Sequence, residues 1–397
     1  MTGHVRRRGA RSGELKFDVG VDANGNRKIR YASFKGTKRD AQIELAKLIA
    51  AAAASTLPDP SKTTVGEYLL KWIDGHRLLS GKTAERYRQL IVSQIIPHLG
   101  AIVLQKLKPA QIADWHDKLA AGGGKEGQPL SNRTVGHAHR VLHKALAHAA
   151  AIELVSRNVA SIVKPPKVEE TEVESLKADE IDTVLAALKD HWLETISVLA
   201  ISTGARRGEI LALTWTHVDL DAGTIKIERS LEQTKAGLRF KAPKTAKGKR
   251  TVSLPPIAVD ALRSHRRRQL ELRLALGHGK PEPGALVFCD HNGDPIPPNN
   301  LSRDRRRFVL TRKLPPISFH GLRHSHVSAL IAGGVDVLTV SRRIGHASPV
   351  VTMKVYAHLF SETDKTAAKA IEAALRSGKE GTVIPILRWQ SGGNLGF

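Results

Sequence analysis

Hydrophobic residues recur along most of the chain at the spacing of one face of a helix, which predicts a largely helical protein. Helices are expected at residues 83–95, 109–119, 132–151, 179–188, 193–203, 257–276, 299–311, 321–332, 337–344 and 349–359. A further helix should begin after Thr64, because Thr64 and Glu67 have the spacing of a capping box ahead of an apolar run. The fold class expected from this pattern is mainly α with small β-sheets (α+β).

Alternation of apolar and polar residues, which is typical of strands, is confined to short segments. Residues 224–227 and 250–254 have this pattern and predict a small sheet in the last part of the chain. Alternation before Lys38 predicts short strands joined by a hairpin turn at residues 22–26. A helix from about Lys38 into the alanine run at 50–54 is expected to follow them.

Proline-rich and charged breaks in these patterns predict several domains. Pro58 and Pro60 end the first helix, and the diproline at Pro165 and Pro166 begins an extended, acidic connection. The expected parts are a first domain over residues 1–57, a helical domain over 62–162, a linker over 163–174, a mixed domain over 175–376 and a tail over 377–397.

The charge of the chain favours a nucleic-acid partner. The sequence has 62 Lys and Arg against 38 Asp and Glu, a formal net charge of +24 and a pI near 10.3, and a field of this sign concentrates polyanions. A ribosomal-type or peripheral membrane protein is an alternative, but 41% hydrophobic residues supports ordinary cored domains. No stretch approaches the roughly 20 apolar residues of a membrane span, and the start lacks the apolar core of a signal peptide. We expect a soluble, cytoplasmic protein with no membrane partner.

The first domain is itself basic and opens with Arg6, Arg7 and Arg8. A solubilising basic tail is one interpretation of this segment. Strands bounded by turns are not typical of a tail, however, so we favour a DNA-binding arm with these three arginines as candidate DNA contacts.

Two features that suggest metal or redox chemistry have simpler interpretations. Cys289 is the only cysteine, so the chain cannot form an intrachain disulfide or a thiolate cluster. Because it follows Leu-Val-Phe in a predicted buried strand, we interpret it as a small core residue. The helix at 132–151 carries His137, His139, His143 and His148 without Asp, Glu or Cys beside them. This set favours a basic helical face that meets phosphates or solvent over a metal site.

Candidate catalytic residues fall in the last domain. Gly204 allows a sharp turn into a helix with Arg206 in its first turn, where the guanidinium fork can grip two phosphate oxygens. A surface ion pair between Arg206 and Glu209 is the alternative. Arg323 lies three residues after His320, so both project from one helical face and can address the same phosphate. Two arginines would neutralise the charge that grows in a pentacoordinate transition state.

A histidine pair and a tyrosine complete the candidate chemistry on the last helices. His320 and His324 have the spacing of a zinc pair, but no Glu follows the first histidine and no third ligand is evident. Tyr356 is a candidate oxygen nucleophile whose free pKa of about 10 requires nearby cations to favour the phenolate. A half-buried core tyrosine is the alternative.

Lys244 is a candidate general acid. It lies on the loop between the two predicted strands, from which it can reach into a groove and protonate a departing 5′ hydroxyl. Lys241, Lys247 and Lys249 compete for this role, and an ordinary solvated hairpin is the alternative.

These candidates, in their order along the chain, resemble the signature of the tyrosine recombinases. The series is Arg206, Lys244, His320-x-x-Arg323, His346 and Tyr356, with further matches at residues 211–219 and 344–346. The chain as a whole is similar to phage-type integrases. The resemblance implies an arm-type DNA-binding domain, a helical core-binding domain and a tyrosine-recombinase catalytic domain, in that order.

The resemblance also implies a mechanism. Tyr356 would attack a DNA phosphate, leaving a 3′-phosphotyrosyl enzyme and a free 5′ hydroxyl. The other implied roles are phosphate binding by Arg206 and Arg323, general acid catalysis by Lys244, assistance of proton transfer by His320, a bond from His346 to a non-bridging oxygen, and support of the site by Glu209.

The implied protein is a site-specific DNA recombinase, an integrase that integrates and/or excises a mobile element in a bacterial cell without a metal or nucleotide cofactor. Family members act as a homotetramer on two double-stranded attachment sites, and the tail after Ser361 is similar to the helix that docks onto a neighbouring protomer. An excisionase and a DNA-bending protein are further candidate partners. A type IB topoisomerase-like enzyme and a non-catalytic DNA-binding protein on an integrase scaffold remain alternatives.

Three positions depart from the commonest family pattern. Gly321 stands where an acidic residue is frequent, and Ser325 stands where threonine is frequent. One residue more than usual separates His346 from Tyr356, and we expect Pro349 to accommodate it by starting the last helix afresh. None of these changes removes a catalytic group.

Overall fold

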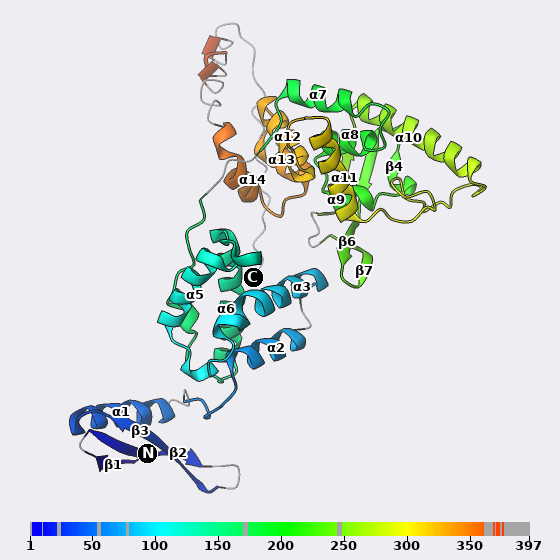
Figure 1. Ribbon diagram of the computed structural model, residues 1–397. Helices are drawn as coiled ribbons and strands as arrows, with labels where there is room; N and C mark the ends of the chain where they lie inside the picture. The colour runs from blue at the N-terminus through cyan, green and yellow to red at the C-terminus, as the bar shows by residue number, and fades with distance from the viewer. Residues whose placement is uncertain are drawn as a thin grey trace, which may run out of the picture. The chain divides into compact units, whose positions relative to one another are not determined.

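The computed structural model describes residues 2–9, 11–21, 25–53, 57–76, 79–169, 174–243, 248–360, 368, 369, 371–373, 375 and 376. The chain divides into two compact units, Met1–Glu170 and Thr171–Phe397 (Figure 1). Both combine helices with small antiparallel sheets, so the fold is multidomain α+β, as the sequence predicts. No helix among the described residues is long and apolar enough to cross a membrane.

The first unit begins with a three-stranded antiparallel sheet and one helix. The elements are β1 (Gly3–Gly9), β2 (Ser12–Val21), β3 (Arg27–Lys35) and α1 (Lys38–Ala53), and the strand order is β1-β2-β3. Leu15 and Phe17 alternate along β2 and are buried together with Ala41 and Leu45 of α1, because residues two apart on a strand share one face. The expected strands and helix are confirmed. Part of the predicted hairpin turn, residues 22–24, lies outside the described residues.

Five α-helices form most of the rest of the first unit, as far as its residues are described. They are α2 (Val65–Gly75), α3 (Gly81–Leu90), α4 (Ile96–Leu99), α5 (Pro109–Gly122) and α6 (Asn132–Ala151). The predicted capping box is present at the start of α2, where the Thr64 N–H donates to Glu67 Oε2 at 2.8 Å. The segment expected as one helix from residue 83 contains a π-helical turn, Ile91–Ile95, that the hydrophobic pattern did not predict. Trp115 Nε1 donates to the carbonyl of Gln94 within that turn at 2.8 Å.

The histidines of α6 do not all lie on one basic face, which corrects the sequence interpretation. His137 and His148 are exposed as expected. His139 is only 4% exposed and lies against His116 of α5, with 3.1 Å between His139 Nδ1 and His116 Nε2. It belongs to the interior because its neighbours along α6, Ala138 and Leu142, face the core. His139 therefore meets neither phosphate nor solvent.

The second unit is built from eight helices and two small sheets among the described residues. The helices are α7 (Ala178–Ala187), α8 (Glu194–Thr203), α9 (Arg207–Leu211), α10 (Pro256–Ala275), α11 (Pro298–Thr311), α12 (Phe319–Ala332), α13 (Val337–Ile344) and α14 (Pro349–Tyr356). The strands are β4 (Val218–Asp219), β5 (Thr224–Ile227), β6 (Ser230–Thr234), β7 (Gly237–Lys241) and β8 (Arg250–Ser253).

One sheet of this unit was predicted from the sequence, and the other was not. The predicted strands β5 and β8 pair antiparallel, with Ile225 opposite Val252. The β6–β7 hairpin was not predicted, because its residues are mostly polar and Leu231 is the one large apolar side chain that it buries. The helix α14 begins at Pro349, with Ser348 as its N-cap, which confirms the expected restart of the last helix.

Two apolar clusters hold the second unit together. The larger one surrounds α8, whose residues Ile196, Leu199 and Ala200 are almost fully buried. The smaller one joins Val327 of α12 and Ile344 of α13 to Tyr356 of α14. These three helices lie together in Figure 1. The small cluster matters for function because it seats the candidate nucleophile in an apolar setting.

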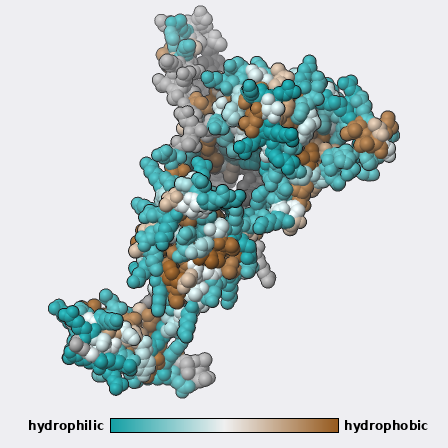
Figure 2. All heavy atoms as spheres, viewed as in Figure 1, coloured by the Kyte–Doolittle hydropathy of each residue, from teal (hydrophilic) through white to brown (hydrophobic). Residues whose placement is uncertain are grey.

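The surface of both units is mostly hydrophilic on the face shown in Figure 2. An exception is the C-terminal end of α10, where Leu272 and Leu274 are 50% and 79% exposed. Hydrophobic residues also gather over the helices of the first unit in this view.

Candidate active site

The catalytic candidates that the structure describes converge where α8, α9, α12, α13 and α14 meet. The described candidates act on one another electrostatically, although they are spread from residue 206 to residue 356 of the chain. They are Arg206, His320, Arg323, His346 and Tyr356. Lys244 lies outside the described residues, so its predicted place stays a prediction.

The end of α8 fixes the position of Arg323. Gly204 ends that helix in the left-handed region (φ 61°), and a Cβ atom there would lie 2.6 Å from the ring of His326. Only glycine fits this close approach. The carbonyl of Gly204 accepts a bond from Arg323 Nη1 at 2.6 Å, so the turn that precedes Arg206 also orients the second arginine.

Arg206 is held by a buried carboxylate. It is the N-cap of α9 rather than a first-turn residue; its backbone N–H donates to Glu209 Oε2 at 2.9 Å and its Nη1 donates to Oε1 at 2.8 Å. The ion pair considered as the alternative therefore exists, but it is not a surface pair. The side chain of Glu209 is only 4% exposed, whereas that of Arg206 is 44% exposed. The carboxylate anchors Nη1 of the guanidinium, and Nη2 lies 3.4 Å from the carbonyl oxygen of Gly345, while much of the side chain remains exposed.

Arg250 is a second anchor, which we did not predict as part of the site. Its Nη2 donates to Glu209 Oε2 at 2.9 Å, and its Nε donates to the carbonyl of Arg343 at 2.8 Å. Burial alone would raise the pKa of Glu209, but the bonds and charges of Arg250 and Arg206 hold it below its usual range. Arg250 and Val252 share the inward face of β8, and a charged residue on a buried face requires a partner. That signal was available in the sequence.

Arg323 is the most deeply buried cation of the cluster. It is 2% exposed, and its Nη2 atom has no hydrogen-bond partner among the described residues. Burial first, and then the charge of Arg206, lower the pKa of Arg323 to about 9, which still leaves it protonated at neutral pH. A buried guanidinium nitrogen without a partner is costly, and an anion that entered the cluster would satisfy it.

The histidines of the cluster are neutral at neutral pH. Burial, with Arg323 and Arg206 nearby, lowers the pKa of His346 to about 4, and burial with His320 and Arg323 nearby does the same for His324. The pKa of His320 is lowered for similar reasons. His346 Nδ1 lies 2.9 Å from the hydroxyl of Thr352. Thr352 could not be predicted from the sequence, because its contact with His346 depends on the path between α13 and α14.

Tyr356 is buried and bonded to His324. Its residue is 2% exposed, and its hydroxyl forms a hydrogen bond with His324 Nδ1. Burial raises the pKa of Tyr356 to about 12, and Arg323 lowers it by less. The expected effect of the cations on the phenol is present, but burial outweighs it, so the phenolate is not favoured in this arrangement.

The two departures on α12 have structural reasons. A Cβ atom at Gly321 would lie 2.5 Å from Ile317, so an acidic side chain does not fit there without a shift. Ser325 uses its hydroxyl to bridge the chain: Oγ donates to the carbonyl of Gly321 at 3.0 Å and accepts from the N–H of Leu176 at 2.8 Å. The bonds of the Ser325 hydroxyl therefore lead to backbone groups and not to a catalytic candidate.

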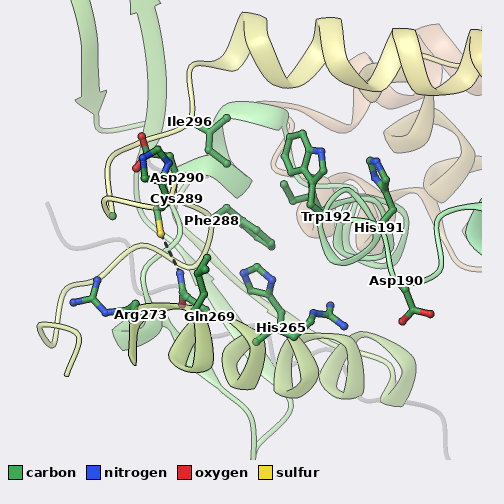
Figure 3. Close-up of a pocket in the computed structure, with 15 residues that line it drawn as sticks. Asp190, His191, Trp192, His265, Gln269, Arg273, Phe288, Cys289, Asp290 and Ile296 are labelled. Atoms are coloured by element: carbon green, nitrogen blue, oxygen red, sulfur yellow. Dashed lines mark hydrogen bonds between the residues drawn. The ribbon is translucent and has the colours of Figure 1, made fainter. Parts of the chain in front are cut away.

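A separate cavity of about 310 Å³ lies between α8, α10 and the segment before α11 (Figure 3). Trp192, His265 and Phe288 contribute to its walls, and none of the catalytic candidates does. Cys289 also lines it, half-buried, and accepts a bond from Gln269 Nε2 at 3.1 Å. The expected strand around Cys289 is only an isolated bridge to Pro295, and Cys289 itself is half-buried at the cavity wall rather than enclosed in the core.

Candidate metal sites are not found in the described part of the chain. No group of three or more His, Cys, Asp or Glu side chains there is arranged to hold a metal ion.

Two models of known protein families match parts of the chain. The phage integrase family matches residues 174–363, and the N-terminal SAM-like domain of phage integrases matches residues 64–120. A XerC-like tyrosine recombinase of Caldanaerobacter subterraneus subsp. tengcongensis is 27% identical over 377 residues, covering 89% of this chain and 94% of that protein. An integrase of Streptomyces ambofaciens is 29% identical over 375 residues, covering 91% of this chain and 93% of that protein.

Solved structures of integrases have the same fold. The Tn1549 transposon integrase in complex with a circular intermediate DNA has a TM-score of 0.65 at 18% identity, covering 79% of this chain and 99% of that one. A lambda integrase dimer bound to a COC′ core site has a TM-score of 0.55 at 20% identity, covering 74% of this chain and 95% of that one. The chain belongs to the phage integrase family of tyrosine recombinases.

Proposed function

We propose that this chain, a site-specific DNA recombinase of the integrase type, cleaves and rejoins DNA through attack of Tyr356 on a phosphodiester. The observation that best supports this assignment is the convergence of two guanidinium groups, three imidazoles and a phenol from separate elements in one cluster. A phosphodiester that gains negative charge in its transition state needs this set of groups.

The two arginines bind the phosphate. Arg206 offers the exposed part of a guanidinium that Glu209 holds in place, and Arg323 offers an Nη2 that has no partner in the described part of the chain. Arg323 stays protonated because its pKa of about 9 lies above neutral pH. Both therefore carry fixed positive charge at the point where charge develops.

His346 donates to a non-bridging oxygen. Its Nδ1 is engaged by the hydroxyl of Thr352, and a neutral imidazole that accepts at Nδ1 carries its proton on Nε2. Thr352 thus positions His346 as a donor. We assign Lys244 as the general acid for the 5′ oxygen and His320 to proton transfer, on the order of the catalytic series.

The covalent step conserves the energy of the broken bond. Tyr356 Oη bonds to phosphorus as the bond to the 5′ oxygen breaks, which leaves a 3′-phosphotyrosyl ester and a free 5′ hydroxyl. Attack of a 5′ hydroxyl from another strand reverses these changes, so no nucleotide is required for rejoining. Integration or excision of a mobile element follows when the strands are exchanged between two attachment sites.

The remaining parts of the chain are assigned by the same family pattern. Residues 1–57 would bind arm-type DNA, with Arg6, Arg7 and Arg8 in β1 as candidate contacts, and residues 62–162 would bind the core site. The linker at 163–174 would join them to a catalytic domain at 175–376. The tail at 377–397 lies outside the described residues, and we keep the expectation that it contacts a neighbouring protomer.

We place the protein on double-stranded attachment sites in the bacterial cytoplasm, as a homotetramer on two sites. An excisionase and a DNA-bending protein are candidate accessory partners. Matched relatives are named as integrases and recombinases, which does not favour a topoisomerase.

A recombination assay tests the function. A supercoiled plasmid with two candidate attachment sites is incubated with the protein, and the products are sequenced across the sites. Recombinant junctions are the expected result. Relaxation without junctions would support a topoisomerase-like enzyme. Binding to a verified cognate site without any covalent adduct would instead support a non-catalytic scaffold.

A further inference from the structure

The partner of the nucleophile is not one of the residues in the catalytic series. Among the described residues, the hydroxyl of Tyr356 bonds to Nδ1 of His324, and the two rings lie 5.6 Å apart between centroids. His324 in turn lies edge-on to the ring of His320, at 4.5 Å between centroids. His324 therefore stands between His320 and the nucleophile.

The surroundings of His324 keep it in the form that accepts a proton. The titratable and charged groups that face it are His320 and Arg323 on α12, His346 after α13 and Tyr356 on α14. Burial first, and then His320 and Arg323, lower the pKa of His324 to about 4. A neutral imidazole that accepts at Nδ1 is a base in hydrogen-bond contact with the phenol.

The phenol needs such a base. Burial raises the pKa of Tyr356 to about 12, so little phenolate exists at neutral pH. Proton transfer to a base with a pKa near 4 is unfavourable before attack and becomes favourable as the phenolic oxygen bonds to phosphorus and loses its basicity. The transfer therefore accompanies bond formation.

We propose that His324 is a further catalytic residue, the general base that removes the proton of Tyr356 during attack. This inference rests on the proposed function. The bond from Tyr356 Oη to phosphorus forms, the bond from phosphorus to the 5′ oxygen breaks, and the phenolic proton moves to His324 Nδ1. The 5′ oxygen takes its proton from a separate general acid.

The reverse reaction uses the same proton. When a 5′ hydroxyl attacks the phosphotyrosyl ester, Tyr356 leaves and the imidazolium of His324 returns the proton to its oxygen. No proton is gained or lost by this pair over cleavage and rejoining. His324 thus serves as base in one direction and as acid in the other.

The test compares single-turnover cleavage of a nicked suicide substrate by the wild type, His324→Asn and His324→Ala across pH 6 to 9. Asparagine places an amide near the position of Nδ1, so it keeps a hydrogen bond to the tyrosine but cannot take its proton. His278→Asn, an exposed histidine on the loop after α10, is the matched control. DNA affinity and thermal unfolding of each variant are measured in parallel.

At pH 7 we expect both variants at His324 to cleave at least about 10²-fold more slowly than the wild type, with DNA affinity retained. Their rates should rise with pH, because hydroxide must replace the missing base, while the wild type and His278→Asn remain nearly flat. If the role of His324 were merely structural, its replacement would change the fraction of substrate that is cleaved without this change in the pH profile.

Two results would overturn the inference while leaving the proposed function intact. If His324→Asn cleaved at the same rate as the wild type and with the same pH profile, His324 would not be the general base. Faster cleavage by His324→Ala would mean that His324 only holds Tyr356 in a buried resting position. Absence of cleavage by the wild type on a verified site would instead count against the proposed function itself.

Discussion

Each unit of the protein buries a group of neutral histidines, and the two groups differ in their partners. In the first unit, His139 bonds to His116. In the second, His324 and His346 bond to the hydroxyls of Tyr356 and Thr352, beside the arginines that we propose to be catalytic. Burial lowers the pKa of His139, His324 and His346 alike to about 4. A depressed pKa therefore does not identify a catalytic histidine here. What distinguishes the second group is its position beside Tyr356, the proposed nucleophile, and beside Arg206 and Arg323.

Among the substitutions proposed here, removal of Arg323 should have the largest effect on DNA cleavage. Arg323→Ala removes a buried cation from the phosphate site, and we expect cleavage to fall by about 10³-fold. Single-turnover rates on a suicide substrate measure this loss. His139→Gln in the first unit is the contrasting variant, and its rate should stay within a few-fold of the wild type. Comparable losses in both variants would remove the distinction between the two groups.

Glu209 links the cluster to the stability of its unit. Glu209→Gln leaves Arg250 without its buried counter-charge, and we expect a loss of about 3 kcal/mol in the free energy of unfolding, together with slower cleavage as Arg206 loses its anchor. Urea unfolding and adduct formation check the two effects. Glu194→Gln is the control, because Glu194 is 3.8 Å from Arg268 in a more exposed pair, and it should cost less than about 1 kcal/mol. An unchanged stability of Glu209→Gln would contradict the assignment.

The buried pair in the first unit predicts a local dependence of stability on pH. The folded pKa of His139 is about 4, below the unfolded value of about 6.5, so the unfolded state binds more protons between these values. Its contribution to stability is present above pH 6.5 and is lost as pH falls toward 4. Hydrogen exchange of α5 and α6 in the full chain should show faster opening at pH 5 than at pH 7, after correction for intrinsic rates.

A matched variant isolates the source of this dependence. In His116→Leu/His139→Leu neither side chain titrates, so opening of α5 and α6 should depend less on pH than in the wild type. Equal dependence in both proteins would show that other groups cause it. Cleavage by the double variant is expected to remain, because the pair lies outside the catalytic cluster.

Replacement of Arg305, a second buried arginine, should have the smallest effect on stability and cleavage, unlike replacement of Arg323. It is also 2% exposed and has nitrogens, Nε and Nη2, without partners among the described residues, but it lies over the ring of Phe319 at 5.4 Å. Replacement of a buried, poorly paired charge by an apolar residue is often neutral or stabilising. We expect Arg305→Met to change the free energy of unfolding by no more than about 1 kcal/mol, and to form the covalent adduct normally. A loss of several kcal/mol in urea unfolding would mean that Arg305 has an unrecognised partner.

The sequence predicted those features that depend on local pattern. The bounds of α6, the capping box at Thr64 and the strands β5 and β8 follow from periodicity and short-range hydrogen bonds, which residues near one another determine. The π-helical turn at Ile91–Ile95 was missed because its apolar residues fit an α-helix equally well. The β6–β7 hairpin was missed because it buries little.

Within the site, the predictions were limited by contacts between distant segments. The identity of the candidate residues came from their order and their resemblance to a family, and it stays a prediction, although the structure brings the described candidates together. The anchoring of Glu209 by Arg250 joins residues 41 positions apart, and the bond between Tyr356 and His324 joins residues 32 positions apart. The burial of Tyr356, which outweighs the effect of Arg323 on its pKa, depends on the packing of three helices and was not evident from composition or spacing.

Covalent capture of the nucleophile is the most direct test of the proposal that Tyr356 attacks DNA. The protein is incubated in EDTA with a nicked suicide substrate that carries a verified attachment site, and the products are denatured and analysed by electrophoresis and peptide mass spectrometry. We predict an adduct linked through Tyr356 that is absent in Tyr356→Phe and unaffected by EDTA. An adduct at another residue, one that persists in Tyr356→Phe, or no adduct on a bound cognate site would contradict the central claim.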